Sequence, residues 1–284
     1  MLSDLRFALR QLAKTPGFTA VALLTLAVGI GSATVVFSAL NALLLRSIPH
    51  VTVPEERLLF GTQTETRLNQ DIGWNYLDFL ALRERTTTLA GLWVHSDRTV
   101  IIPGSKRPER LLGTEISWDA FGLMGVAPVL GRPFTDQDAT AAAAPVALIS
   151  AGLWQRRYGG APEVIGTTVI INQQPTLIIG VMPPGWRYPD FTDVWTPLRP
   201  DPAKPFARGS FNFSGRALLK PGVTLAAAQA ETDVIFGALE REFPATNGSV
   251  RARFRPIREE AIEESENFIF LLFAHCGFLS DLIV

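Results

Sequence analysis

The chain has 284 residues, which is enough for one large domain or two small ones beside a membrane segment. Its formal net charge of -1 argues against a nucleic-acid-binding protein, because such proteins present a basic face. Cys276 is the only cysteine, so an intrachain disulfide is excluded. Aromatic residues, glycine and proline are all frequent, which predicts a folded domain with many turns rather than a disordered chain.

Residues 1–14 are basic and amphipathic. Leucines recur at helical spacing along one face, and Arg6, Arg10 and Lys14 follow the neighbouring face. The pattern predicts a cytoplasmic helix that lies at the lipid headgroup boundary. A helical lead-in that simply continues into the next segment is the alternative interpretation.

Residues 15–45 contain no Asp, Glu, Lys, Arg or His. At about 1.5 Å per helical residue they reach about 46 Å, which exceeds a hydrocarbon core of about 30 Å. We therefore predict a transmembrane helix over 15–45. The cations before it place the amino terminus in the cytoplasm and the large domain outside. A cleaved signal peptide is the alternative, but its apolar centre is normally only about 7–15 residues long.

Residues 47–265 mix strands and helices without a regular βαβ alternation, which predicts an α+β domain. Strands are expected at 58–62, 92–102, 110–116, 146–149, 168–171, 176–181, 211–219 and 250–257. Helices are expected at 76–85, 118–124, 151–158 and 225–243. Gly125 is expected to end the second helix, while Ser150 and Thr224 are expected to cap the last two. The hairpin around 172–175 is the clearest β signal.

Three details of this domain are open to test. Residues 183–205 are expected to form an irregular surface excursion around Trp195. The packed face of the helix over 225–243 is expected to carry Ala226, Ala227, Ala230, Val234 and Leu239. Three arginines alternate with apolar residues in the last strand, namely Arg251, Arg253 and Arg255. They have the composition of an anion site, but we interpret them as a solvated strand face.

The sequence holds no recognisable catalytic or metal motif. It lacks a phosphate-binding G-x-x-x-x-G-K-[ST] loop, a G-x-S-x-G nucleophile turn and an H-E-x-x-H zinc motif. His50, His95 and His275 are scattered along the chain. Asp136 and Asp138 resemble the start of a calcium loop, but the further ligands are missing, which predicts a surface loop. We therefore predict no catalytic, cofactor-binding or metal-binding residues, no cofactor, and a protein that is not an enzyme.

The carboxyl-terminal residues 267–284 are mostly apolar and follow a polar, glutamate-rich segment. They are expected to form a partial second transmembrane helix of only about 17 residues, in which Asp281 is costly in hydrocarbon. A truncated or frameshifted gene product is one interpretation of this ending.

Several stretches together carry a family resemblance, although each alone is weak. They are residues 1–49 and the segments PERLLGTEIS (108–117), GVAPVLGRPF (125–134), VALISAGLWQRRYGG (146–160), IGVMPPGWRYP (179–189) and LLKPGVTLAAAQAE (218–231). The chain resembles the amino-terminal part of an ABC transporter permease of the MacB/FtsX type, most closely the duplicated orphan permeases. The resemblance implies a first transmembrane helix followed by a MacB-like periplasmic core domain over residues 47–265.

The resemblance also implies partners and a location. The chain would be an inner-membrane permease component that couples a separate ABC ATPase subunit to the extracytoplasmic domain, for export or mechanotransmission. A second permease half or a homodimer, membrane lipid and a periplasmic adaptor are the other implied partners; nucleic acid is not. Two alternatives stay open: a single-pass anchored periplasmic module that regulates a partner as FtsX-like proteins do, and a non-functional permease fragment.

Overall fold

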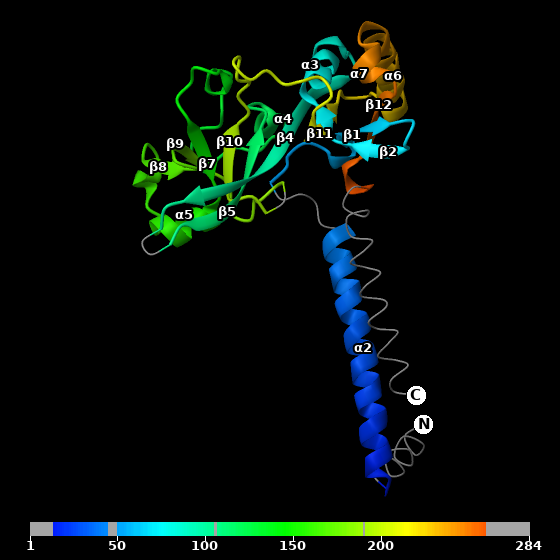
Figure 1. Ribbon diagram of the computed structural model, residues 1–284. Coiled ribbons are helices and arrows are strands. Elements are labelled where there is room, and N and C mark those ends of the chain that lie inside the picture. The colour runs from blue at the N-terminus through cyan, green and yellow to red at the C-terminus, as the bar shows by residue number, and fades with distance from the viewer. Residues whose placement is uncertain (1–13, 45–49, 105–106, 190, 260–284) are drawn as a thin grey trace. The chain divides into compact units, whose positions relative to one another are not determined.

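The computed structural model describes residues 14–44, 50–104, 107–189 and 191–259 (Figure 1). The chain divides into two compact units, residues 1–46 with 258–284 and residues 47–257. The predicted helix over 267–284 and residues 1–13 of the predicted interfacial helix lie outside the described residues.

Helix α2 (Pro16–Leu44) accounts for most of what is described in the first unit. It is 29 residues long and carries no charged side chain, so the predicted helical conformation is confirmed. Large apolar side chains along its first half are exposed, including Phe18, Leu24 and Ile30. Among the described residues, no helix is identified as long and apolar enough to cross a lipid bilayer.

The second unit is the predicted α+β domain. Its described residues form one sheet of 12 strands, whose main path runs β12-β1-β11-β4-β5-β10-β7-β9-β6. The strands are β1 (Leu58–Glu65), β2 (Gln70–Ile72), β3 (Trp74–Asn75), β4 (Leu89–Ile102), β5 (Glu109–Ile116), β6 (Leu130–Gly131), β7 (Val146–Ile149), β8 (Thr168–Ile171), β9 (Gln174–Val181), β10 (Val194–Pro197), β11 (Phe211–Leu219) and β12 (Val250–Pro256). Two neighbouring pairs, β5–β10 and β7–β9, are parallel, whereas the other pairs are antiparallel.

The helices of this unit begin and end largely where their capping residues predict. They are α3 (Tyr76–Arg85), α4 (Ala120–Met124), α5 (Ala151–Tyr158), α6 (Leu225–Glu242) and α7 (Pro244–Asn247), with 3₁₀ turns η1 (Glu55–Arg57), η2 (Gln137–Ala139) and η3 (Pro162–Val164). The hydroxyl of Ser150 accepts from the N–H of Leu153, and Thr224 caps α6 in the same way. Gly125 ends α4 at a φ of 69°, a left-handed conformation that glycine adopts without strain.

The first hydrophobic core lies between the sheet and helices α3 and α6. Strands β1, β11, β12 and the first half of β4 contribute Leu59, Leu92, Ala217 and Phe254, and Trp74 packs edge-on against Phe236 of α6. The buried stripe of α6 consists of Ala228, Thr232, Ile235, Phe236 and Leu239.

The predicted packed face of α6 was therefore wrong except at Leu239. Ala226, Ala227 and Ala230 are exposed, and Val234 is 71% exposed. The alanines suggested a close-packed surface because they are small. The helix instead turns the large side chains of Ile235, Phe236 and Leu239 toward the sheet, and the smaller Ala228 and Thr232 lie on the same buried face.

A buried carboxylate fixes α3 to the loop before β11 and to α7. Asp78 is 1% exposed and accepts hydrogen bonds from Arg208, Gln63 and Asn247 at 2.5, 3.1 and 3.0 Å. The guanidinium of Arg208 also lies over the ring of Phe243, 3.7 Å from its centroid. A buried charge is tolerated when it is paired and fully hydrogen-bonded in this way.

A second carboxylate joins α6 to the turn between α3 and β4. Glu231 accepts five hydrogen bonds from Thr86, Thr87 and Thr88, three from their hydroxyls and two from the backbone N–H groups of Thr87 and Thr88. The turn therefore depends on one side chain from a helix that lies far along the sequence.

The opposite face of the sheet supports a second core under α4. This core contains Trp93, Phe121, Trp186 and Trp195, and the last two indole rings pack edge-on against Phe121. The expectation that 183–205 is irregular throughout was wrong, because β10 is an inner strand between β5 and β7 and Trp195 is fully buried. A four-residue strand buried on both faces shows no alternation of polar and apolar residues, so periodicity does not reveal it.

Candidate functional site

The far half of β4 and five other strands form a small barrel-like arrangement. The pairing order β4-β5-β10-β7-β9, with β8 beside β9, brings β8 round toward β4. Asn172 joins the two edges: its backbone N–H donates to Ile101 at 3.0 Å, and its side-chain oxygen accepts from the N–H of Ile101 at 2.9 Å. Its side-chain amide also donates to the carbonyl of Thr99 at 3.1 Å.

The turn that places Asn172 is local to the sequence. Asn172 and Gln173 connect β8 to β9, and both have positive φ values, 50° and 69°. Two-residue hairpins favour this left-handed backbone, and asparagine tolerates it better than most residues. The predicted hairpin is confirmed, with β9 beginning earlier than expected, at Gln174.

The inside of this arrangement is a third hydrophobic core. Alternate residues of the strands point inward, among them Val100, Ile102, Ile149, Ile178 and Val194. Leu153 of α5 and Val164 of η3 belong to the same core, and an alternating sheet pattern predicts such an interior. The even-numbered residues of β4 thus contribute to two cores: Leu92 and Val94 lie in the first core, whereas Val100 and Ile102 lie in the third.

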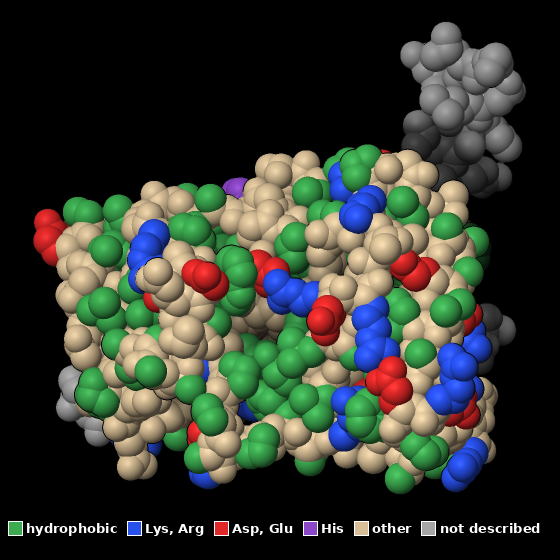
Figure 2. Space-filling model, turned by 90° about the horizontal axis from the view of Figure 1, so that it is seen from above, with side chains coloured by type: hydrophobic (Ala, Val, Ile, Leu, Met, Phe, Trp, Pro, Cys, Tyr) green, Lys and Arg blue, Asp and Glu red, His purple; other side chains and the backbone are tan. Residues whose placement is uncertain are grey.

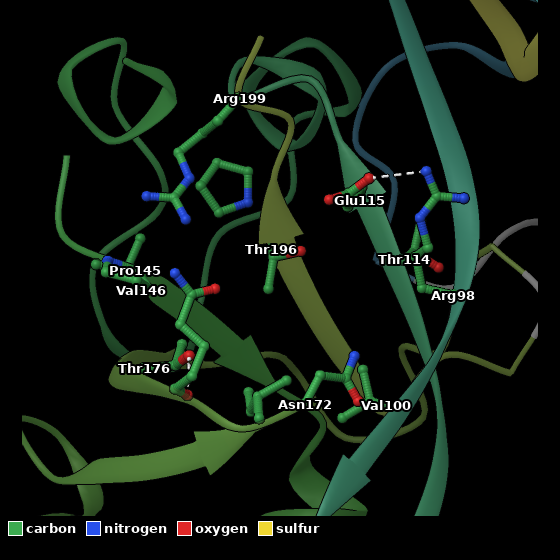
Figure 3. Close-up of a pocket in the computed structure, with 13 residues that line it drawn as sticks. Arg98, Val100, Thr114, Glu115, Pro145, Val146, Asn172, Thr176, Thr196 and Arg199 are labelled. Carbon is green, nitrogen blue, oxygen red and sulfur yellow. Dashed lines mark hydrogen bonds and ion pairs between the residues drawn. The ribbon is translucent and has the colours of Figure 1, made fainter. Parts of the chain in front are cut away.

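A cavity of about 280 Å³ opens at the mouth of the barrel. It exists because β7 and β10 pair only at Val194–Ile149 and Trp195–Leu148, and beyond Trp195 they separate. Figure 3 shows Thr196 of β10 in the middle of this opening, with Arg199 on one side and the Arg98–Glu115 pair on the other.

Two arginines and one carboxylate set the charge of the mouth. Arg98 of β4 pairs with Glu115 of β5 at 3.1 Å, and both side chains are more than a third exposed. Arg199 donates from Nη1 to the carbonyl oxygen of Ala143 at 2.6 Å. Within the described part of the chain, no carboxylate lies within ion-pair distance of Arg199, so the mouth carries one surplus positive charge.

A second hollow, of about 250 Å³, lies beside the start of α3. Its lining is mostly apolar and includes Tyr76, Phe79, Trp118 and Leu198. Figure 2, which views the domain from above, shows a hollow with hydrophobic side chains and with charged side chains around its rim. This second hollow has few polar groups with which to orient a ligand.

Arg83 lines the second hollow and forms an ion pair with Asp119 at 2.6 Å. Burial raises the pKa of Asp119 more than the guanidinium of Arg83 lowers it.

The three histidines are not brought together by the fold. His50 contacts the carbonyl of Pro184 at 2.8 Å, while His95 is buried in β4 at 1% exposure. Burial, and then the charge of Arg216, lowers the pKa of His95 well below its usual value. His275 lies outside the described residues, among which no group of three or more His, Cys, Asp or Glu side chains is placed to hold a metal ion.

The two aspartates of the apparent calcium-loop start have structural partners. Asp138 pairs with Arg132 at 2.6 Å and accepts a hydrogen bond from the backbone N–H of Thr135. The bond from Arg132, and then that from Thr135, lower the pKa of Asp138 below its usual value although partial burial acts in the opposite direction. Asp136 accepts from the N–H of Gln137 at the start of η2. Both side chains therefore stabilise a turn.

The arginines of β12 lie on one strand face, as predicted. Arg251 pairs with Glu240 at 2.5 Å and Arg255 with Asp71 at 3.4 Å, whereas Arg253 is exposed. Because two of the three charges are already neutralised by the chain itself, the row is better described as a solvated face than as an anion site.

Sequence reasoning did not single out the side chains at the barrel mouth. Arg98 and Arg199 are about a hundred positions apart, and only the register of β5 beside both β4 and β10 brings them to one opening. The sole local signal was Arg98 itself, a charged residue on the same side of β4 as Val100 and Ile102.

Comparisons with known proteins identify the fold. The structure resembles the periplasmic region of MacB from Actinobacillus actinomycetemcomitans, with a TM-score of 0.55, 14% identity, 79% of this chain covered and 98% of that one. It also resembles the extracellular domain of the noncanonic ABC-type transporter YknZ from Gram-positive bacteria, with a TM-score of 0.50, 13% identity, and 69% and 98% of the two chains covered. No match was found among curated proteins.

The sequence itself gives the family. The profile described as the MacB-like periplasmic core domain matches residues 19–235, which is more than half of the chain. It includes β1 to β11, and with them the barrel and its mouth. The chain belongs to the MacB-like periplasmic core domain family of ABC transporter permeases.

Proposed function

We propose that this chain is a permease component in which a separate cytoplasmic ABC ATPase subunit drives movement of the extracytoplasmic domain. The observation that carries the proposal is the single family match over residues 19–235, which begins inside the uncharged helix α2 and extends into α6 of the folded unit. One family pattern therefore contains both the hydrophobic helix and the domain that follows it.

Residues 15–45 are assigned as a transmembrane helix, with the amino terminus in the cytoplasm and residues 47–265 in the periplasm. Helix α2 has 29 uncharged residues and reaches about 44 Å. Its side chains of Phe18, Leu24 and Ile30 are 71%, 65% and 65% exposed, a cost in water that lipid removes. No membrane span is identified among the described residues. The proposed assignment rests instead on the length of the uncharged helix and on those exposed apolar side chains.

The proposed partners are the ATPase, a second permease half or a second copy of the chain, membrane lipid and a periplasmic adaptor. The domain suits a role in transmitting movement, because backbone pairing runs without interruption from β12, under α6, to β9 in the barrel. A ladder of hydrogen-bonded strands resists deformation along its length. Residues 267–284 are proposed to begin the next membrane helix of the permease.

Reporter fusions test the topology. Alkaline phosphatase fused after Arg46 is expected to be active, and the same enzyme fused after Lys14 serves as the cytoplasmic control. An inactive phosphatase after Arg46, together with a fluorescent cytoplasmic reporter at the same position, would contradict the proposed orientation.

Affinity purification of the full chain from its native cells tests the partners. An ABC ATPase is expected to co-purify, and a variant with Asp, Lys and Arg placed in the middle of 15–45 is expected to lose it. Crosslinking of the exported domain mainly to an envelope hydrolase would instead favour the regulatory role of the FtsX kind.

A further inference from the structure

The mouth of the barrel has the construction of a small-molecule site. It is concave, it holds about 280 Å³, and side chains from six strands line it. Val100, Val146 and Ile171 give it an apolar floor, while Thr176 and Thr196 supply polar groups. Ligand sites are typically apolar hollows with a few convergent polar groups, and the mouths of β-barrels are a common place for them.

The charge of the mouth selects the sign of the ligand. Glu115 is already paired with Arg98, so it offers little to a cation. Arg199 uses Nη1 for the carbonyl of Ala143, whereas its Nε and Nη2 have no hydrogen-bond partner among the described residues. Those two nitrogens form the edge of a guanidinium that binds a carboxylate through two parallel hydrogen bonds.

We propose that the barrel mouth binds a small carboxylate that carries an apolar group. Arg199 would hold the carboxylate, and the apolar group would lie against Val146 and Ile171. The cavity is slightly smaller than the about 300–1,000 Å³ of sites for drug-sized ligands, so the ligand is a single small unit. A free carboxylic acid and the carboxyl-terminal residue of a peptide share this chemistry.

Methyl NMR of the full chain in detergent micelles tests the binding, with N-acetyl-L-leucine as the probe. We expect the methyl signals of Ile171 and Val146 to shift with a dissociation constant on the order of millimolar, which is typical of so small a ligand. N-acetyl-L-leucine methyl ester, which lacks the charge, and N-acetylglycine, which lacks the apolar group, are each expected to bind at least about tenfold more weakly. These comparisons use the unmodified protein and do not depend on any variant folding.

A matched pair of substitutions locates the site. Arg199→Gln is expected to weaken binding about tenfold or more, because a charge-assisted bidentate contact is lost. Arg110→Gln removes an exposed arginine from β5 of the same barrel, away from the cavity lining, and is expected to leave binding unchanged. Thermal unfolding of both variants checks that the fold is retained.

The proposal is overturned if the methyl ester binds as well as the acid, if Arg199→Gln binds like the unmodified chain, or if no shift occurs at about ten times the expected dissociation constant. An acetylated peptide ending in leucine then separates the two ligand sources. Binding of this peptide, lost on amidation of its carboxyl end, assigns a peptide terminus, whereas binding of N-acetyl-L-leucine alone assigns a free acid. Either result leaves the topology and ATPase experiments above unaffected.

Discussion

Replacing Glu231 by Gln tests whether one carboxylate holds the turn between α3 and β4. Burial raises the pKa of Glu231, but hydrogen bonds from Thr87, Thr88 and Thr86 outweigh it and lower the pKa to about 2. Glutamine keeps the shape of the side chain but has one acceptor oxygen instead of two. The backbone N–H of Thr87 and that of Thr88 donate to different oxygens of Glu231. In the glutamine variant, one of these two N–H groups would face the side-chain NH₂ and would have no acceptor.

The expected cost follows from that unpaired N–H group. A buried donor without a partner costs about 1–3 kcal/mol, and because solvent reaches Glu231 in part, we expect about 1–2 kcal/mol at neutral pH. For a domain of this size each kcal/mol lowers Tm by about 2–4 °C, so the Tm of the variant should be about 2–8 °C lower. The folded pKa of about 2 is below the usual glutamate value of 4.5, so the stabilisation is complete above about pH 4.5 and is lost as pH falls toward 2.

Thermal unfolding of the full chain, followed by tryptophan fluorescence at several pH values, measures this difference. Glu84→Gln is the matched control, because Glu84 is an exposed carboxylate on α3 for which no hydrogen bond is found in the described residues; its Tm should change little. Equal Tm values for Glu231→Gln and the unmodified chain at neutral pH would refute the reasoning. So would a difference that stays constant down to about pH 2, where the Glu231 carboxylate is half protonated in the folded chain and almost fully protonated in the unfolded chain.

Three further changes should alter stability in defined ways. Asp78→Ala leaves the charge of Arg208 without its buried partner and should cost about 3–5 kcal/mol in chemical unfolding; a cost within about 1 kcal/mol would argue against the buried network. Gly215→Ala places a methyl group against the indole of Trp74, and a loss of about 1–3 kcal/mol in the same assay is expected unless that ring can move. Because burial lowers the folded pKa of His95, the unfolded chain binds more protons than the folded chain below about pH 6.5. The free energy of unfolding should therefore decrease by up to about 1.4 kcal/mol for each pH unit as the pH falls below about 6.5. His95→Gln should reduce this pH dependence, and an unchanged pH dependence would contradict the prediction.

Elements with strong local signals could be predicted from the sequence. The helix over 76–85 has the predicted bounds, and the side chain of Asn75 accepts from the N–H groups of Leu77 and Asp78 at its start. The hairpin of β8 and β9 was predicted from two strand-like stretches on either side of a short turn at 172–175, and the pairing confirms it. Strand β10 was missed because burial on both faces removes the alternation. The face of α6 was misassigned because alanine content is a weaker guide than the spacing of large side chains.

The barrel mouth was beyond prediction for a different reason. Arg98 lies in β4 and Arg199 lies two residues after β10, and these two strands are joined only through β5. A parallel pairing such as β5–β10 leaves no mark on the sequence near either residue. Asn172, which joins β8 to β4, read simply as a turn residue. Its side chain bonds to Ile101 and Thr99 of β4, more than 70 positions away, and such contacts arise only from the tertiary structure.

Strand β4 has a consequence for how this protein can be divided. Its 14 residues reach about 48 Å and contribute to the first hydrophobic core, under α3 and α6, at one end and to the barrel core at the other. Strands β5 to β10 all lie between β4 and β11 in the sequence, and β4 pairs directly with β11, so the barrel strands are inserted between two neighbouring strands of the same sheet. Exchanging the barrel between relatives would require cutting through a continuous strand. Chimeras that keep β4 and β11 from one parent should therefore be recovered more often than those joined within either strand.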